Sequence, residues 1–118
     1  MSDLVWLDMT QDELDAAYDQ SAYAPNRMQL LKRFETNSDA VRARIGMPRR
    51  EAYGPGEKEQ LDIYSCGRDS APVNVFIHGG AWRSGTAAQY GFHAELFVHA
   101  GRIWWCRILT GCRIATVT

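Results

Sequence analysis

The spacing of apolar residues in the first part of the chain predicts helices. Thr10-Gln-Asp-Glu13 fits a capping box, and the apolar residues that follow it share one helical face, so a helix is predicted over about 10–20. Pro25 can open a second helix, because the first turn does not need its missing N–H. The polar run 36–39 favours a break in that helix, and Gly46 is expected to end it.

After residue 50 the pattern becomes that of strands. Two short strand-like pieces flank the turn residues Gly54-Pro-Gly56, and the second alternates polar and apolar positions over 61–64, as a half-buried strand does. The run Val73–Ile77 is β-rich and largely apolar, which is typical of a strand deeper in a sheet. Residues 87–101 can form a helix that ends at Gly101.

This order of elements predicts the opening of an α/β domain: a helical leader, a β-hairpin, an inner strand, a glycine loop and a helix. We divide the chain into a leader over 1–50, the start of the α/β domain over 51–101, and an atypical tail over 102–118.

Composition narrows the function classes without selecting one. The 118 residues suffice for one modest domain, and thirteen basic against fourteen acidic residues leave a net charge of −1, so nothing favours nucleic acid or an anionic membrane as a partner. The acidic start does not resemble a secretory signal, and no apolar run is long enough to span a bilayer. Three cysteines match neither a zinc pattern nor a disulfide framework, so we expect a reduced, cytoplasmic setting without a metal.

The stretch "VFIHGGAW", residues 75–82, carries the candidate chemistry. Acyl transfer builds negative charge on a carbonyl oxygen, and fixed N–H donors stabilise that charge. Glycines let a backbone come close enough to donate. In this interpretation Gly79, Gly80 and Ala81 line an oxyanion hole, His78 braces the loop by hydrogen bonds, and Trp82 walls the substrate pocket. The alternative is a plain turn that ends a strand; the placement between a strand and a helix favours the functional interpretation.

Over about residues 8–101 the sequence resembles the N-terminal part of α/β-hydrolase-fold esterases, especially the arylformamidase-like (kynurenine formamidase-like) group. The segments that carry the resemblance are "AYGPGEKEQLDIYS", "APVNVFIHGGAWRSG" and "AELFVHAG". Ala81 stands in place of the third glycine of an HGGG-type loop. The resemblance implies hydrolysis of small carboxylic esters or formamides by a Ser, acid and His triad, with no cofactor and no metal.

The triad itself is missing from these 118 residues. In this fold the nucleophile sits in G-x-S-x-G after the glycine loop, and no serine here has glycines at both −2 and +2. Ser84 is interpreted as a helix cap, and His93 and His99 as packing or surface residues. We therefore expect an inactive N-terminal fragment of a serine hydrolase.

The tail "RIWWCRILTGCRIATVT" differs from the apolar strand that the resemblance implies after Gly101. One hypothesis is a one-nucleotide frame slip, because the preceding frame through Trp104-Trp105 must encode Val-Val. A strand over Ile103–Ile108 at a sheet edge is the alternative, and a nucleic-acid surface formed by the tail arginines is a weaker one.

Two other functions remain open, namely a non-catalytic module that binds a partner through an exposed sheet edge, and a half-enzyme completed by another chain. In the fragment interpretation the segments that would cover the strand Val73–Ile77 come from sequence outside these 118 residues. The apolar side chains of Val73, Val75, Phe76 and Ile77 are therefore expected to be incompletely buried, which would allow self-association through an exposed apolar surface.

Overall fold

A computed structural model describes residues 3–80 and 84–108. The chain forms two compact units, residues 1–30 and 31–118. None of the helices in the described ranges is long and apolar enough to cross a membrane.

The first unit holds a short hairpin followed by two helices. The predicted capping box is confirmed: the Glu13 amide donates to the Thr10 hydroxyl, and the Thr10 amide donates to the Glu13 carboxylate at 2.8 Å. The helix that it opens ends at Tyr18, close to the predicted boundary. The elements are β1 (Leu4–Trp6), antiparallel to β2 (Met9–Thr10), then α1 (Gln11–Tyr18) and α2 (Gln20–Tyr23).

Helix α3, Arg27–Ile45, is continuous, so the predicted break at 36–39 is wrong. Its polar residue Ser38 is fully buried, and the hydroxyl exchanges hydrogen bonds with backbone groups of another segment instead of competing with its own helix. The helix ends as predicted at Gly46, which has a φ of 96° and donates its amide to the Arg42 carbonyl.

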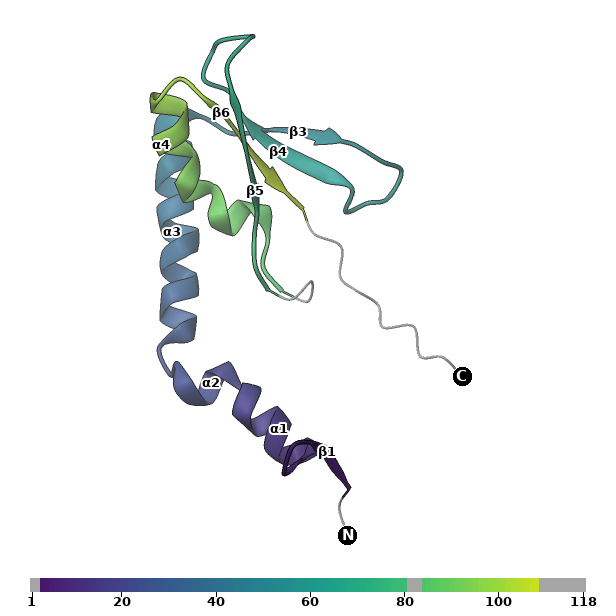
Figure 1. The fold of residues 1–118 in the computed structure, drawn as a ribbon. Helices are drawn as coiled ribbons and strands as arrows, with labels where there is room; N and C mark the ends of the chain where they lie inside the picture. The colour runs from purple at the N-terminus through teal and green to yellow at the C-terminus, as the bar shows by residue number, and fades with distance from the viewer. Residues whose placement is uncertain (1–2, 81–83, 109–118) are drawn as a thin grey trace. The chain divides into compact units, whose positions relative to one another are not determined.

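A four-stranded mixed sheet forms the centre of the second unit (Figure 1). The predicted hairpin and the strand that ends before His78 are confirmed. In space the order is β3-β4-β6-β5; β3 pairs with β4 and β4 with β6 antiparallel, whereas β5 and β6 are parallel. The strands are β3 (Arg49–Ala52), β4 (Gln60–Tyr64), β5 (Val73–Ile77) and β6 (Ile103–Arg107).

Strand β6 comes from the segment 102–118, for which the sequence predicted an atypical tail. The predicted strand over Ile103–Ile108 is confirmed over Ile103–Arg107, but it lies inside the sheet, paired on both sides, so the expected edge position is wrong. Its backbone pairs with β4 on one side and β5 on the other, while its side chains alternate: Trp104 and Cys106 point to one face and are completely buried, and Trp105 on the other face is partly buried. The frame-slip hypothesis concerns the gene and stays a prediction.

The segment 87–99 is helical in two pieces, η1 (Ala87–His93, a 3₁₀ helix) and α4 (Ala94–His99). Its start at Ala87 agrees with the helix predicted over 87–101, but the cap is Thr86 and not Ser84. The Thr86 hydroxyl accepts the Gln89 amide, and the Gln89 side chain accepts the Thr86 amide at 3.1 Å, which completes a second capping box.

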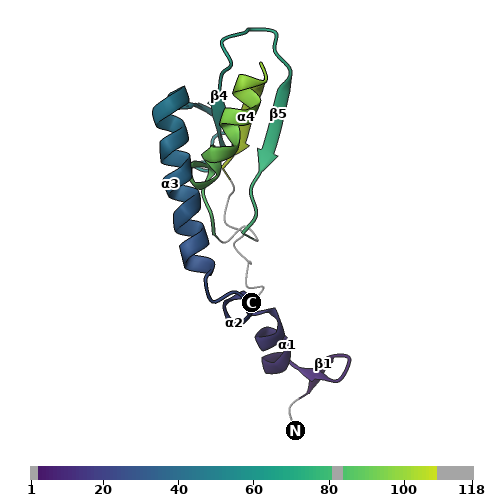
Figure 2. The ribbon, with the colours of Figure 1, turned by 90° about the vertical axis from the view of Figure 1, so that its left-hand side faces the viewer.

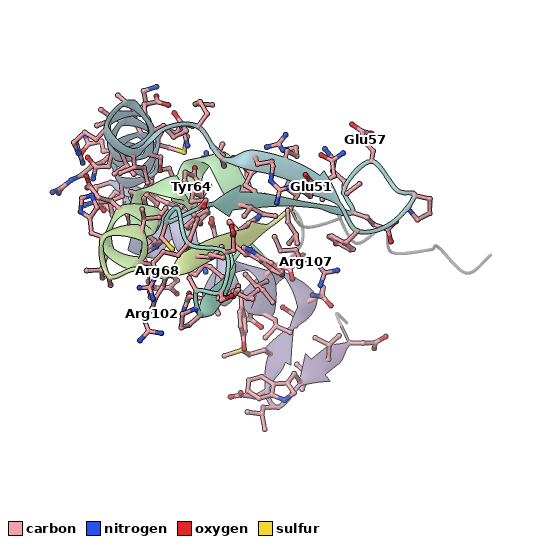
Figure 3. All side chains as sticks on the ribbon, turned by 90° about the horizontal axis from the view of Figure 1, so that it is seen from above. Glu51, Glu57, Tyr64, Arg68, Arg102 and Arg107 are labelled. Atoms are coloured by element: carbon pink, nitrogen blue, oxygen red, sulfur yellow. The ribbon has the colours of Figure 1, made fainter. Side chains whose placement is uncertain are left out.

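The core lies between this helical segment and one face of the sheet. Helices α3 and α4 lie on the same side of the strands (Figures 1 and 2). Side chains of β4 and β6 meet η1 and α4 there, and Tyr64 lies on the helix side in Figure 3. The buried cluster consists of Tyr64, Ala87, Ala94, Trp104 and Cys106, with Phe76, Phe97 and Val98 packed partly against it.

The opposite face of the sheet, which we call the open face, carries apolar side chains that remain exposed. Val73, Val75 and Ile77 of β5 are 45%, 56% and 58% exposed, and Phe76 on the covered face is partly buried, so the predicted incomplete burial is confirmed. Strand alternation and pairing register define the open face as Arg49, Glu51, Leu61, Ile63, Val73, Val75, Ile77, Ile103, Trp105 and Arg107.

Candidate functional site

The glycine loop follows β5 and precedes η1. Strands β5 and β6 are parallel, and their last residues, Ile77 and Arg107, lie side by side. The loop therefore begins at the carboxyl ends of both strands. In α/β proteins ligands bind outside the carboxyl ends of parallel strands. The loop therefore occupies a position suited to a binding or catalytic site.

His78 is held tightly at the start of the loop. Only 4% of the residue is exposed, its Nδ1 lies 2.7 Å from the Gly79 carbonyl oxygen, and its ring stacks on Tyr90 with an interplanar angle of 7°. A carbonyl oxygen only accepts, so Nδ1 carries the hydrogen of this bond. Nε2 is buried, with no hydrogen-bond partner in the described part of the chain.

The conformation of the loop requires glycine at two positions. Gly80 has a φ of 117°, and a Cβ there would collide with the Ser84 carbonyl oxygen, because the Ser84 amide donates back to the Gly80 carbonyl at 3.2 Å. Gly85 has a φ of 89°, and its Cβ position lies 3.0 Å from the Nδ1 atom of His78. By contrast, none of the described residues comes within 4 Å of the position of a Cβ at Gly79.

The structure thus brings together three of the residues expected at the site, His78, Gly79 and Gly80. The other two, Ala81 and Trp82, lie outside the described residues. Ser84 packs against Gly80 through its backbone, and among the described residues its hydroxyl makes no hydrogen bond.

Polar side chains of α3 hold the segment that follows the loop, a feature that the sequence reasoning missed. The Ser38 hydroxyl donates to the Gln89 carbonyl at 2.8 Å and accepts the Phe92 amide at 3.0 Å. The Arg42 guanidinium donates to the Ala88 carbonyl at 2.8 Å. Ser38 and Arg42 are four residues apart and so share one face of α3, a signal that was readable in the sequence.

An ion pair between a buried carboxylate and a partly exposed arginine lies on the covered face of the sheet. Asp62 is 2% exposed and accepts two hydrogen bonds from Arg50, at 2.7 and 3.0 Å, which raise the pKa of Arg50. Burial, with a smaller contribution from Asp62, raises the pKa of the nearby Cys106 thiol to about 12. Cys106 is therefore a protonated core residue and not a nucleophile.

The Asp62 pair borders a pocket of about 520 Å³. Its charges are already matched, since Arg50 binds Asp62 and Arg42 binds Asp39 at 2.6 Å. Burial raises the pKa of Tyr64, whose hydroxyl lies beside the Arg42 guanidinium. The pocket thus offers no free charge to a ligand; it is lined by Asp39, Arg42, Ala43, Met47, Pro48, Arg50, Asp62 and Ala88.

His93 and His99 take positions at the ends of α4. His93 packs against the rings of Phe92, Phe76 and Trp104, and burial lowers its pKa. His99 is the last residue of the helix. Within the described ranges no group of three His, Cys, Asp or Glu side chains is arranged to hold a metal ion.

Two curated proteins are similar to this chain. No family model matches it. It is 30% identical over 105 residues to kynurenine formamidase from Salmo salar, covering 81% of this chain and 35% of that protein, and 30% identical over 119 residues to kynurenine formamidase from Danio rerio, covering 87% and 37%. This chain is related to the arylformamidases. The resemblance found in the sequence is thereby confirmed, and the chain spans about a third of the length of the curated relatives it matches.

A solved structure supports the α/β architecture of the present chain. A proposed thioesterase from Silicibacter sp. TM1040 superimposes with a TM-score of 0.70 at 22% sequence identity, over 85% of this chain and 39% of that one. At this identity the likeness concerns the fold alone. The chain is a mixed α/β protein whose four-stranded sheet and helices have a counterpart in a larger protein.

Proposed function

We propose that this chain forms the N-terminal, oxyanion-loop part of an α/β-hydrolase-fold serine hydrolase that acts on small formamides or carboxylic esters. The observation that carries the proposal is the relation to two proteins named kynurenine formamidase, combined with a His-Gly-Gly loop at the end of a parallel strand. The loop follows the third strand of the sheet along the chain, the position from which hydrolases of this fold take one oxyanion-hole N–H.

In the proposed reaction the triad serine, which lies outside these 118 residues, gives its hydroxyl proton to the triad histidine and adds to the substrate carbonyl, whose oxygen becomes an oxyanion. When the carbonyl re-forms, the amine or alcohol leaves with that proton. The N–H groups of Gly80 and Ala81 donate to this oxygen, while Gly79 leaves space for its approach. One such donor typically accounts for about 3 kcal/mol of the barrier. His78, fixed by its bond to Gly79 and its stack on Tyr90, braces the loop and takes no proton from the nucleophile. Trp82 walls the substrate pocket, and neither a cofactor nor a metal takes part.

The 118-residue chain by itself is expected to be inactive. It contains no G-x-S-x-G, and Cys106 is a buried thiol that stays protonated. Purified chain should therefore hydrolyse neither N-formylkynurenine nor p-nitrophenyl acetate above background. Saturable turnover that disappears in a folded Ser84→Ala variant would contradict this expectation, because it would make Ser84 a nucleophile.

The loop itself is testable in an active relative. Residues 78–86 would replace the corresponding segment of the Danio rerio kynurenine formamidase, and hydrolysis of N-formylkynurenine would be measured. We expect the chimera to keep its activity. Ala81→Pro, which removes one N–H, should lower kcat by about 10²–10³, whereas the control Ala81→Gly keeps the donor and most of the rate. Equal rates for the two variants would remove the oxyanion role from this position.

A further inference from the structure

One face of α3 contacts the segment that follows the glycine loop. Helical spacing places Phe34, Glu35, Ser38 and Arg42 on this face, and each of them contacts a residue within 86–92. Helix α3 and the helical segment after the loop lie side by side in both views (Figures 1 and 2). These contacts join two segments of one compact unit, so they do not depend on a surface that further sequence could cover.

Side chains bridge α3 to both ends of the turn that opens the segment. The Gln89 side chain donates to the Glu35 carboxylate at 3.0 Å, while its oxygen accepts the Thr86 amide at 3.1 Å. The Arg42 side chain is only 12% exposed, and it can approach because Gly91 has no side chain: a Cβ there would lie 2.8 Å from Nη1 of Arg42. The segment is thus fixed to the helix by hydrogen bonds that are largely shielded from water.

Two contacts carry this fixed position on to the loop. The backbone at Gly85 lies against the loop, since a Cβ there would be 3.0 Å from Nδ1 of His78 and 3.2 Å from the Gly79 carbonyl oxygen. The Tyr90 ring lies between α3 and the loop, with its centroid 5.9 Å from that of Phe34 and 5.2 Å from that of His78. The histidine that begins the loop is therefore held by the backbone and by an aromatic ring.

We propose that Ser38 and Arg42 are positioning residues for the oxyanion loop. They fix the segment 86–92, this segment holds His78, and His78 holds the loop that carries the proposed donor N–H of Gly80. The catalytic consequence rests on the proposed function. A donor stabilises an oxyanion only at about 2.7–3.1 Å, and a misplacement of about 1 Å can cost about 10²-fold in rate.

NMR spectroscopy of the 118-residue chain tests the positioning without requiring activity. Ser38→Ala and Arg42→Met each remove one of the side chains that fix the segment after the loop. Each should shift the amide signals of Gly79 and Gly80, although neither side chain hydrogen-bonds to the loop. Each should also speed hydrogen exchange at Nδ1 of His78 at least about tenfold, because the loop then opens more often.

Two control variants separate positioning from a loss of stability. Val41→Ala, at a 4% exposed position of the same helix, destabilises the chain without removing a hydrogen bond and should leave the loop signals unchanged. Arg42→Lys keeps a donor for the Ala88 carbonyl and should restore most of the protection that Arg42→Met loses. Thermal melts show which variants fold. Unchanged loop signals in either folded variant, Ser38→Ala or Arg42→Met, would overturn the proposal, as would an equal change in Val41→Ala.

Kinetics of a larger chimera test the catalytic consequence. Residues 27–108 would replace the corresponding part of the Danio rerio kynurenine formamidase. Ser38→Ala should lower kcat for N-formylkynurenine by about 10–10²-fold and leave KM within about twofold, because a misplaced donor weakens the transition state and not substrate binding. An unchanged kcat beside shifted loop signals would overturn the catalytic role. An inactive parent chimera with loop signals that shift as expected would contradict the proposed function and support the positioning, so the two failures are distinguishable.

Discussion

The two adjacent tryptophans of β6 should differ sharply in their contribution to stability. Trp104 is completely buried on the covered face, with ring centroids 5.5 Å from Tyr64 and 5.6 Å from Phe76. Trp104→Ala should cost about 3–5 kcal/mol, the usual loss for a buried aromatic residue. Trp105, on the open face, is only partly buried, so Trp105→Ala should cost less, at most about 1.5–3 kcal/mol.

A third variant separates packing from hydrogen bonding. The Trp104 indole N–H is buried and has no partner among the described residues, so Trp104→Phe removes an unsatisfied donor together with some volume. We expect Trp104→Phe to cost less than half as much as Trp104→Ala. Urea denaturation followed by far-UV circular dichroism measures the free energy of unfolding of all three variants, and the m-value should be the same in each. A loss in Trp104→Ala no larger than in Trp105→Ala would refute the assignment of the two faces and the place of β6 inside the sheet.

Three further changes test the loop, the α3 contacts and a buried histidine by thermal melting. Gly80→Ala should destabilise the chain by about 1–3 kcal/mol, because Gly80 has a positive φ and a Cβ there would collide with the Ser84 carbonyl oxygen. Gly79→Ala should cost less, because none of the described residues lies within 4 Å of its Cβ position. Equal losses in the two variants would contradict the loop geometry. Ser38→Ala should cost about 1–3 kcal/mol, because the Gln89 carbonyl and the Phe92 amide lose their side-chain hydrogen-bond partner. Thr36→Ala, which removes only an exposed hydrogen bond, should cost less than about 1 kcal/mol. Burial lowers the pKa of His93, so its contribution to stability is complete above the unfolded value of about 6.5 and declines as the pH falls below it. The melting temperature should therefore fall more steeply from pH 7.5 to 5.5 in the wild type than in His93→Phe, and parallel slopes would exclude this role of His93.

Local signals were enough to predict the capped helix at Thr10, the hairpin and the strand before His78. Each depends on residues a few positions apart. The features that the sequence did not reveal depend on contacts between distant segments. Ser38 stays within α3 because its hydroxyl meets groups more than fifty residues away. The place of β6 inside the sheet likewise depends on two partners, one of them more than forty residues away.

The candidate site divides in the same way. The glycine loop was readable because His-Gly-Gly between a strand and a helix is a local motif. The need for glycine at position 80 could not be predicted from the sequence, since it arises from the Ser84 carbonyl, which folds back against that position. Thr86 was missed as the helix cap because Ser84 also offers a hydroxyl near the same boundary, and only the bond to Gln89 distinguishes the two.

The spatial order β3-β4-β6-β5 has a consequence for how the sheet is assembled during synthesis. β3 and β4 can pair as soon as residue 64 is available, but β5 has no neighbour until β6, made thirty residues later, inserts between it and β4. Bringing such distant segments together costs loop entropy before any pairing is gained, which slows folding. Until then Val73–Ile77 is a free apolar strand with two unpaired edges, and this interval is when a chaperone would be most useful to the nascent chain.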